Sequence, residues 1–140
     1  MIEQPLSETE KRELLQLADE AAQRAYAPYS NFQVGAVVLT DSGERFIGCN
    51  VENASYGLTS CAERNALFGT QINATTRPIA VRAVLVVESK HRAFTPCGAC
   101  RQVMLELAPH ALVYFTDSSG ALTSCGVSDL LPEGFGIPKP

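Results

Sequence analysis

Two short segments carry most of the information in this chain: Cys61-Ala62-Glu63 and, farther along, Pro96-Cys97-Gly98-Ala99-Cys100. Together they offer three thiols, which bind zinc as thiolates, and a carboxylate two residues after the first thiol. Zinc in proteins is usually tetrahedral, so three protein ligands leave its fourth position to water, which is the arrangement of a catalytic site. The pattern therefore predicts a catalytic centre with one Zn²⁺ per chain.

The spacing of the cysteines supports a shared ion. If the second segment starts a helix, Cys97 and Cys100 lie one turn apart on the same face, and Cys61 at the start of another helix completes the metal ligands. Helix starts also direct amide groups and positive dipole ends at thiolates. Glu63 is then the catalytic candidate, because it can take a proton from the water in the fourth position and deliver it to a substrate.

Three thiolates leave a divalent ion with a net charge of about −1, which makes its bound water a weaker acid. Something must offset that charge. Arg64 follows Glu63 and Arg101 follows Cys100, so both are expected to donate hydrogen bonds to the sulfurs from outside the ligand set. Without the cysteine motifs, both arginines would be interpreted as ordinary surface charges.

Other interpretations of the cysteines stay open. The Cys97–Cys100 pair alone also fits a structural zinc site or a thioredoxin-like redox pair. Neither requires Cys61 followed by Glu63 at a helix start, so the combination favours catalytic zinc. His91 could still close the site as a fourth ligand. The two remaining cysteines are expected to be small buried hydrophobic residues: Cys49 and Cys125.

The composition favours one soluble α/β domain over residues 1–140, since 46% hydrophobic residues suffice for a real core. The net charge of −4 and the scattered placement of the eleven Lys and Arg residues argue against nucleic acid as a partner. The polar, acidic start of the chain and the lack of a long apolar run predict a cytoplasmic protein that makes no membrane contact. Five cysteines without a secretory signal favour metal binding over disulfides.

Apolar periodicity and turn residues predict the order of the elements. Ser7 and Glu10 form a capping box, and the apolar face that follows runs on until Pro28. The later elements are a hairpin over 34–50 with its turn at 41–43, a helix over 62–68, a strand over 81–87 covered on both faces, a helix over 97–107, strands over 112–115 and 122–125, and a helical turn over 128–131.

This order predicts a mixed sheet with helices on both faces. The turn over 117–120 is too short for a crossover, which needs about a dozen residues, so the last two strands should run antiparallel.

From about Tyr26 to Phe135 the chain resembles the small, single-domain cytidine deaminases. Beyond the cysteine motifs, the resemblance rests on four ordered blocks: Ala27-Pro28-Tyr29-Ser30; Phe32 with Val34-Gly35-Ala36; Gly48-Cys49-Asn50-Val51-Glu52-Asn53-Ala54-Ser55-Tyr56; and Leu130-Leu131-Pro132-Glu133-Gly134-Phe135. The resemblance implies a three-layer α-β-α fold with a mixed five-stranded sheet.

The resemblance also implies roles for single residues. Asn50 and Glu52 would hold a ribose hydroxyl, and Phe32 would pack on the nucleoside. Three further residues would reach an active site from neighbouring subunits of a homotetramer with shared sites: Ala54, Tyr56 and Phe135. Taken alone, the polar pair would be interpreted as turn caps and the aromatic residues as ordinary core or as a cover for their own sheet.

The activity so implied is zinc-dependent hydrolytic deamination of cytidine and 2′-deoxycytidine to uridine and 2′-deoxyuridine, a step of pyrimidine salvage. A deaminase for a cytosine antibiotic such as blasticidin S is the alternative with the same metal site, although Asn50, Glu52 and Arg64 together favour the ribonucleoside. The deaminases of tRNA and single-stranded DNA usually carry histidine where Cys61 stands. Outside this chemistry, a dithiol redox protein or a zinc-stabilised binding module stays possible.

Overall fold

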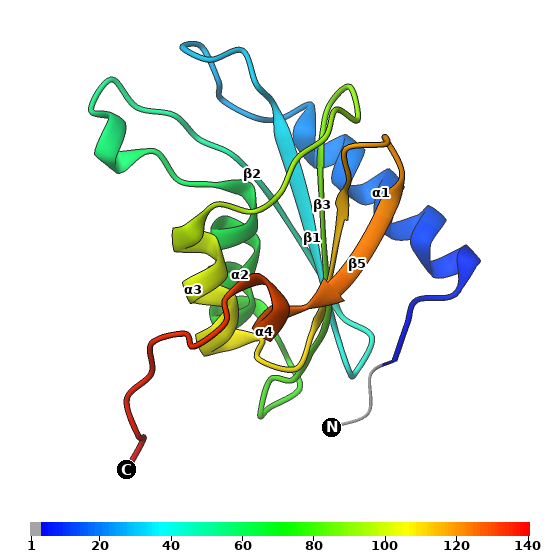
Figure 1. Cartoon of the computed structure of the whole chain (residues 1–140), viewed down its shortest axis with the longest axis vertical. Helices are drawn as coiled ribbons and strands as arrows, with labels where there is room; N and C mark the ends of the chain where they lie inside the picture. Colours follow the sequence, from blue (N-terminus) through cyan, green and yellow to red (C-terminus); the bar gives the residue numbers. More distant parts are fainter. Residues whose placement is uncertain (1–3) are drawn as a thin grey trace.

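The structure, a computed structural model, describes residues 4–140 and is built around one mixed five-stranded sheet (Figure 1). The strands are β1 (Val34–Thr40), β2 (Arg45–Cys49), β3 (Val81–Glu88), β4 (Leu112–Thr116) and β5 (Leu122–Gly126), in the spatial order β2-β1-β3-β4-β5. Only β3 and β4 are parallel neighbours, and β4 and β5 run antiparallel. The predicted mixed sheet and the antiparallel last pair are therefore confirmed.

The first helix, α1 (Glu8–Ala22), begins with the predicted capping box. The Ser7 hydroxyl accepts the Glu10 N–H over 3.1 Å, and the Glu10 carboxylate accepts the Ser7 N–H over 3.0 Å. The helix ends at Ala22, earlier than the apolar pattern suggested. Beyond it, the Tyr26 N–H donates to the Asn50 carbonyl over 3.0 Å. The chain thus leaves the helix to line up beside the segment that follows β2.

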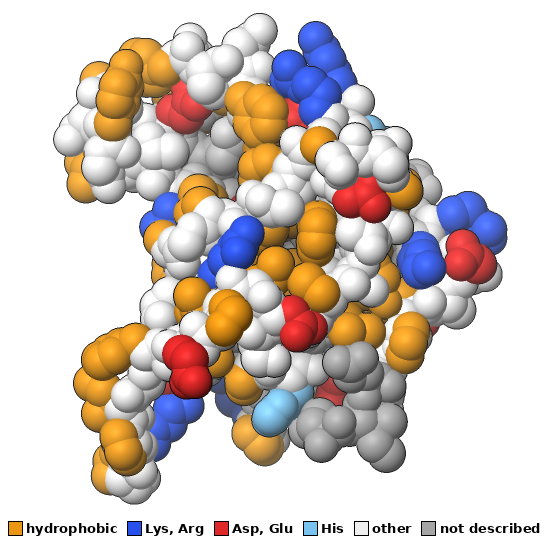
Figure 2. Space-filling model, in the orientation of Figure 1, with side chains coloured by type: hydrophobic (Ala, Val, Ile, Leu, Met, Phe, Trp, Pro, Cys, Tyr) orange, Lys and Arg blue, Asp and Glu red, His pale blue; other side chains and the backbone are white. Residues whose placement is uncertain are grey.

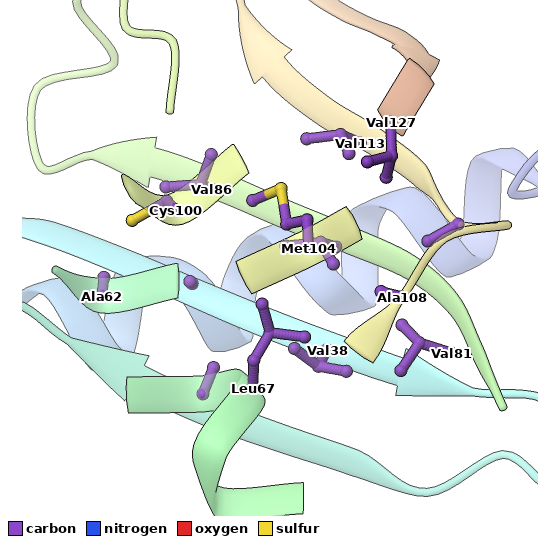
Figure 3. Close-up of a cluster of buried hydrophobic side chains, with 14 of the residues drawn as sticks. Val38, Ala62, Leu67, Val81, Val86, Cys100, Met104, Ala108, Val113 and Val127 are labelled. Atoms are coloured by element: carbon purple, nitrogen blue, oxygen red, sulfur yellow. The ribbon is translucent and has the colours of Figure 1, made fainter. Parts of the chain in front are cut away.

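Helices cover both faces of the sheet, so the layers follow the predicted α-β-α order. Helix α1 packs on one face, whereas α2 (Ala62–Asn73), α3 (Gly98–Leu107) and the short α4 (Val127–Leu130) lie on the other (Figure 1). All seven residues of β1 are buried, as expected for a strand covered on both sides. On the α2–α3 face the core is filled by residues that include Leu67, Val86, Met104 and Val113 (Figure 3).

Two glycines let helix backbones approach the sheet closely. A Cβ atom on Gly35 of β1 would lie 1.8 Å from the Ala18 carbonyl oxygen in α1. On the opposite face, a Cβ atom on Gly48 of β2 would lie 2.5 Å from both the Ala62 carbonyl oxygen and the Ala66 nitrogen in α2. The start of α2 is therefore seated directly on β2, which positions the Cys61 and Glu63 side chains.

The other elements match their predicted positions within a few residues, with two differences. Helix α2 continues to Asn73, five residues past the predicted end, and buries Thr70 in its last turns. A short 3₁₀ helix, η1 (Tyr56–Leu58), was not expected in the loop between β2 and α2. Among residues 4–140, no helix has the length and apolar character needed to cross a bilayer.

Candidate metal centre and active site

Three cysteine sulfurs meet where α2 and α3 begin. Cys61 is the N-cap of α2, Cys97 is the N-cap of α3, and Cys100 lies in the first turn of α3. The three sulfurs lie within 4.8 Å of one another, and those of Cys61 and Cys97 are 3.8 Å apart. Ligand sulfurs about 2.3 Å from a tetrahedral zinc are separated by about 3.8 Å, so this cluster fits the ion.

Nearby donors stabilise negative charge on the sulfurs. The Cys100 N–H donates to the Cys97 sulfur over 3.5 Å, and Arg64 Nη2 donates to the Cys61 sulfur over 3.3 Å. The interaction with the Cys100 thiol, followed by that with Arg64, lowers the pKa of Cys61 to about 5 against the opposing effect of burial. The same pairing, together with burial, raises the pKa of Cys100. A metal cation would allow both sulfurs to be ionised together.

The sequence predicts that Arg101 donates a hydrogen bond to a sulfur, but the structure shows its side chain bonded to two backbone carbonyls. Its Nε donates to the Pro96 carbonyl and its Nη1 to the Leu130 carbonyl, both over 2.8 Å. The residue lies one position after Cys100, so its side chain leaves the helix about 100° around from the ligand. Arg101 therefore ties the backbone just before Cys97 to the end of α4.

The other candidates for the metal lie elsewhere. His91 Nε2 is 2.6 Å from the Asp19 carboxylate of α1, so this ring is engaged away from the sulfur cluster. Cys49 and Cys125 are half-buried and unpaired, and neither belongs to the cluster. Within residues 4–140, the three-sulfur cluster is the only such group of His, Cys, Asp or Glu side chains.

Glu63 is a buried carboxylate without a partner. Its side chain belongs to a residue that is 1% exposed, and neither carboxylate oxygen has a hydrogen-bond partner among residues 4–140. Burial, reinforced by the negative charge of the Cys61 thiolate, raises the pKa of Glu63 to about 7. An unsatisfied buried carboxylate is costly unless a ligand or water completes it. A pKa near neutrality also suits a group that both accepts and donates protons.

A cavity of about 290 Å³ opens beside Glu63 and Cys61. It brings together five of the predicted site residues: Phe32, Asn50, Glu52, Cys61 and Glu63. Sequence reasoning missed Phe94, whose ring centroid lies 5.7 Å from that of Phe32, so that two aromatic side chains form one wall. The only sequence signal for Phe94 was its position two residues before Pro96, where the second cysteine motif begins. Ser30 and Thr59 also line the cavity and were not singled out.

Asn50 and Glu52 hold the backbone that leads into β1. The Asn50 amide accepts the Val34 N–H and donates to the Phe32 carbonyl, each over 2.8 Å. The Glu52 carboxylate accepts the Ser30 hydroxyl and the N–H groups of Tyr29 and Ser30, and these hydrogen bonds lower the pKa of Glu52. Both polar side chains therefore shape the cavity wall, and each keeps unused hydrogen-bonding capacity for a ligand.

The remaining predicted contacts do not line this cavity in their own chain. Tyr56 is 76% exposed and borders a second cavity of about 370 Å³, which shares Ser30, Glu52 and Thr59 with the first. Phe135 is 68% exposed, in a C-terminal segment held to α3 by the Gln102 side chain, which donates to the Phe135 carbonyl over 3.0 Å. Ala54 is exposed in the same loop as Tyr56. This loop and the C-terminal segment project from the body on either side of a hollow (Figures 1 and 2).

Comparison with known proteins agrees with this site. Residues 8–116 match the family model described as the cytidine and deoxycytidylate deaminase zinc-binding region. A cytidine deaminase from Halalkalibacterium halodurans is 45% identical over 127 residues, which cover 90% of this chain and 94% of that protein. A cytidine deaminase from Mycobacterium tuberculosis is 40% identical over 120 residues, covering 86% of this chain and 85% of that protein.

Solved structures resemble the whole fold. The crystal structure of cytidine deaminase from Burkholderia pseudomallei has a TM-score of 0.81 and 47% identity, covering 93% of this chain and 100% of that chain. The crystal structure of cytidine deaminase from Mycobacterium tuberculosis has a TM-score of 0.78 and 38% identity, covering 91% of this chain and 98% of that chain. The protein described here is a member of the cytidine and deoxycytidylate deaminase family.

Proposed function

We propose that this protein removes the amino group of cytidine and 2′-deoxycytidine by hydrolysis, giving uridine or 2′-deoxyuridine and ammonia, as a step of pyrimidine salvage. The observation that carries the proposal is the unpartnered Glu63 carboxylate, which borders the same cavity as Cys61 of the three-sulfur cluster. Cytosine carries an exocyclic amine that becomes a leaving group only when protons are delivered to it. A buried carboxylate that has no hydrogen-bond partner among residues 4–140 and borders the cavity is suited to that delivery.

Cys61, Cys97 and Cys100 would hold the zinc ion, and the bound ion would supply Lewis-acid activation of the attacking water. Glu63 takes a proton from that water and passes it to the ring nitrogen next to the reacting carbon. Glu63 then takes the remaining proton of the newly added hydroxyl group and delivers it to the amine, so that the product carbonyl forms and the amine leaves as ammonia. Arg64 offsets the negative charge of the sulfurs through its hydrogen bond to Cys61.

The cavity wall orients the nucleoside. Phe32 and Phe94 offer adjacent aromatic surfaces, against which a flat pyrimidine or the sugar can pack. Asn50 and Glu52 lie on the same cavity, and the hydrogen-bonding capacity that they retain can grip one ribose hydroxyl. This arrangement favours an uncharged nucleoside, which gains nothing from a strongly cationic surface.

The active unit is a homotetramer in this proposal, with Ala54, Tyr56 and Phe135 completing the sites of neighbouring subunits. Their exposure supports this arrangement, since none of the three lines the 290 Å³ cavity of its own chain. Replacing Phe135 by alanine should weaken nucleoside binding and loosen the assembly. Ile137→Ala is the matched control, because Ile137 is 71% exposed in the same segment. Sedimentation and KM values that are unchanged in Phe135→Ala would remove this residue from the site.

The protein acts as one domain in the cytoplasm in this proposal. All five cysteines are unpaired, which is the state expected in a reducing compartment.

The direct test is ammonia release from cytidine, measured for the wild type and for Glu63→Gln. The variant should retain zinc and bind nucleoside, yet turn over orders of magnitude more slowly, because only proton delivery is lost. Glu106→Gln is the control, since Glu106 is a half-exposed carboxylate on α3 that pairs with Lys139. Near-normal turnover by Glu63→Gln would contradict the assigned role. Faster turnover of blasticidin S than of cytidine would transfer the proposal to the antibiotic.

A further inference from the structure

The Phe32 ring on the cavity wall is contacted by a cation. The guanidinium carbon of Arg92 lies 5.0 Å from the centroid of the Phe32 ring, within the range of a cation–π interaction. Arg92 itself is not among the residues that line the cavity, and about half of its side chain is exposed. Any influence of Arg92 on a bound ligand therefore passes through Phe32.

Arg92 is held in place by a fully buried carboxylate. Its Nε donates to Glu88 Oε1 over 3.0 Å, and its Nη2 donates to Glu88 Oε2 over 2.8 Å. The Glu88 side chain is 0% exposed, and it also accepts the N–H groups of Lys90 and Arg92 and the Ser89 hydroxyl. Both carboxylate oxygens are thus satisfied, so the two-point contact fixes the plane of the guanidinium. An exposed arginine on a loop has no such restraint.

The anchor and the ring are attached to neighbouring strands. Glu88 at the end of β3 pairs with Val34 at the start of β1, and the Ser89 N–H donates to the Gln33 carbonyl over 2.8 Å. Phe32 directly precedes Gln33, and its carbonyl accepts the Asn50 amide. The backbone of Phe32 is therefore fixed by β-sheet contacts, whereas Arg92 contacts its ring.

We propose that Arg92 is a positioning residue for the nucleoside: anchored on Glu88, it holds the Phe32 ring against the cavity. This inference rests on the proposed function in that the cavity takes a cytosine nucleoside. Phe32 contacts the ligand before and during the reaction, so its position affects substrate and transition state alike. Such uniform binding changes KM and leaves kcat nearly constant.

The kinetic test compares Arg92→Leu, Arg92→Lys and Arg45→Leu with the wild type. Arg45 is the control, because its side chain also pairs with a carboxylate, that of Glu13 over 3.0 Å, and does not line the cavity. Arg92→Leu should raise KM roughly three- to tenfold with kcat within about twofold, the change expected for one lost cation–π contact. Arg92→Lys keeps a cation, so its KM should lie between the KM of the wild type and that of Arg92→Leu. In a Phe32→Ala background, Arg92→Leu should have no further effect on KM.

A second readout does not depend on activity. With 4-fluorophenylalanine in place of the six phenylalanines, the ¹⁹F resonance of Phe32 can be assigned through Phe32→Leu. This resonance should shift or broaden in Arg92→Leu and stay in place in Arg45→Leu. An unchanged Phe32 resonance, an unchanged KM, or an equal effect of Arg92→Leu with and without Phe32 would overturn the inference. If the wild type itself fails to deaminate cytidine, the proposed function falls, and the resonance alone decides whether Arg92 holds the ring.

Discussion

The Nη2 atom of Arg64 lies 3.3 Å from the sulfur of Cys61, three residues earlier at the start of the same helix. The Arg64 Nε atom is buried and has no hydrogen-bond partner among residues 4–140. The guanidinium is therefore turned toward the sulfur cluster, where its positive charge opposes the excess negative charge of three thiolates. Hydrogen bonds to metal ligands of this kind tune the affinity for the ion and the acidity of its water.

Replacing Arg64 by glutamine should lower zinc affinity or turnover by about 10- to 100-fold, the usual effect of losing a donor to a metal ligand. Competition with a chromophoric chelator gives the affinity, and uridine formation gives kcat/KM. Arg77→Gln serves as the control, because the Arg77 side chain donates to the Gln71 carbonyl at the exposed end of α2. Equal zinc affinity and activity in both variants would show that the contact with Cys61 is without consequence.

Removal of zinc should abolish deamination and make three more thiols reactive toward a disulfide reagent. Metal coordination protects Cys61, Cys97 and Cys100, whereas Cys49 and Cys125 lie outside the cluster and should react alike in both forms. Adding zinc back should restore both turnover and protection. A fully active, metal-free preparation with a reversible Cys97–Cys100 disulfide would instead support a redox protein.

Acid should weaken the attachment of α1 through Glu10. The Arg82 side chain and the capping box lower the pKa of Glu10 from 4.5 to about 2. Because the folded protein holds the carboxylate ionised, this contribution is complete above about pH 4.5 and is lost as the pH falls toward 2. It amounts to roughly 2 kcal/mol after allowance for partial exposure of the pair.

Urea unfolding of the wild type and of Glu10→Gln at several pH values measures this contribution. The difference in unfolding free energy between the two proteins should be largest near neutral pH and shrink below pH 4.5. Zinc loss in acid affects both proteins equally, because Glu10 lies in the first turn of α1 on the face of the sheet opposite the cluster. A constant difference at all pH values would contradict the assignment to Glu10.

Gly48→Ala should destabilise the protein by about 3 kcal/mol and shift α2, because a new Cβ atom would press on backbone atoms of Ala62 and Ala66 that cannot rotate away. Gly136→Ala is the control, since a Cβ atom there meets nothing within 4 Å. Thermal unfolding measures stability, and zinc content reports whether Cys61 stays in place. Normal zinc content together with normal stability in Gly48→Ala would show that α2 is not seated on β2 as described.

The elements with strong local signals could be predicted from the sequence. The Ser7–Glu10 capping box set the start of α1, and the continuous apolar run of β3 marked a strand covered on both faces. The four-residue turn after β4 required an antiparallel return. The end of α1 could not be predicted from the helical pattern. Beyond the helix, the Tyr26 N–H donates to the carbonyl of Asn50, and Asn50 is distant in the sequence.

The candidate site likewise combines features that local sequence patterns predict with features that depend on contacts between distant residues. Cys61, Cys97 and Cys100 could be placed together because helical spacing alone brings the last two to one face. The position of Arg101 next to Cys100 predicts a hydrogen bond to the sulfurs, whereas its side chain donates to two backbone carbonyls.

The aromatic wall depends on contacts between β1 and the segment after β3, which no local pattern encodes. Phe94 and Arg92 reach the Phe32 ring because Glu88 of β3 pairs with Val34 of β1, and this pairing has no local sequence signal.

The sulfurs of Cys61 and Cys97 are 36 positions apart in the chain and stand at the starts of two different helices. An ion bound between them would fasten those helices to each other, so the free energy of metal capture would also be folding energy. In a cell short of zinc, the protein would then become scarcer as well as less active, because chains that open more often are removed by proteases. Its cellular level would report on metal supply.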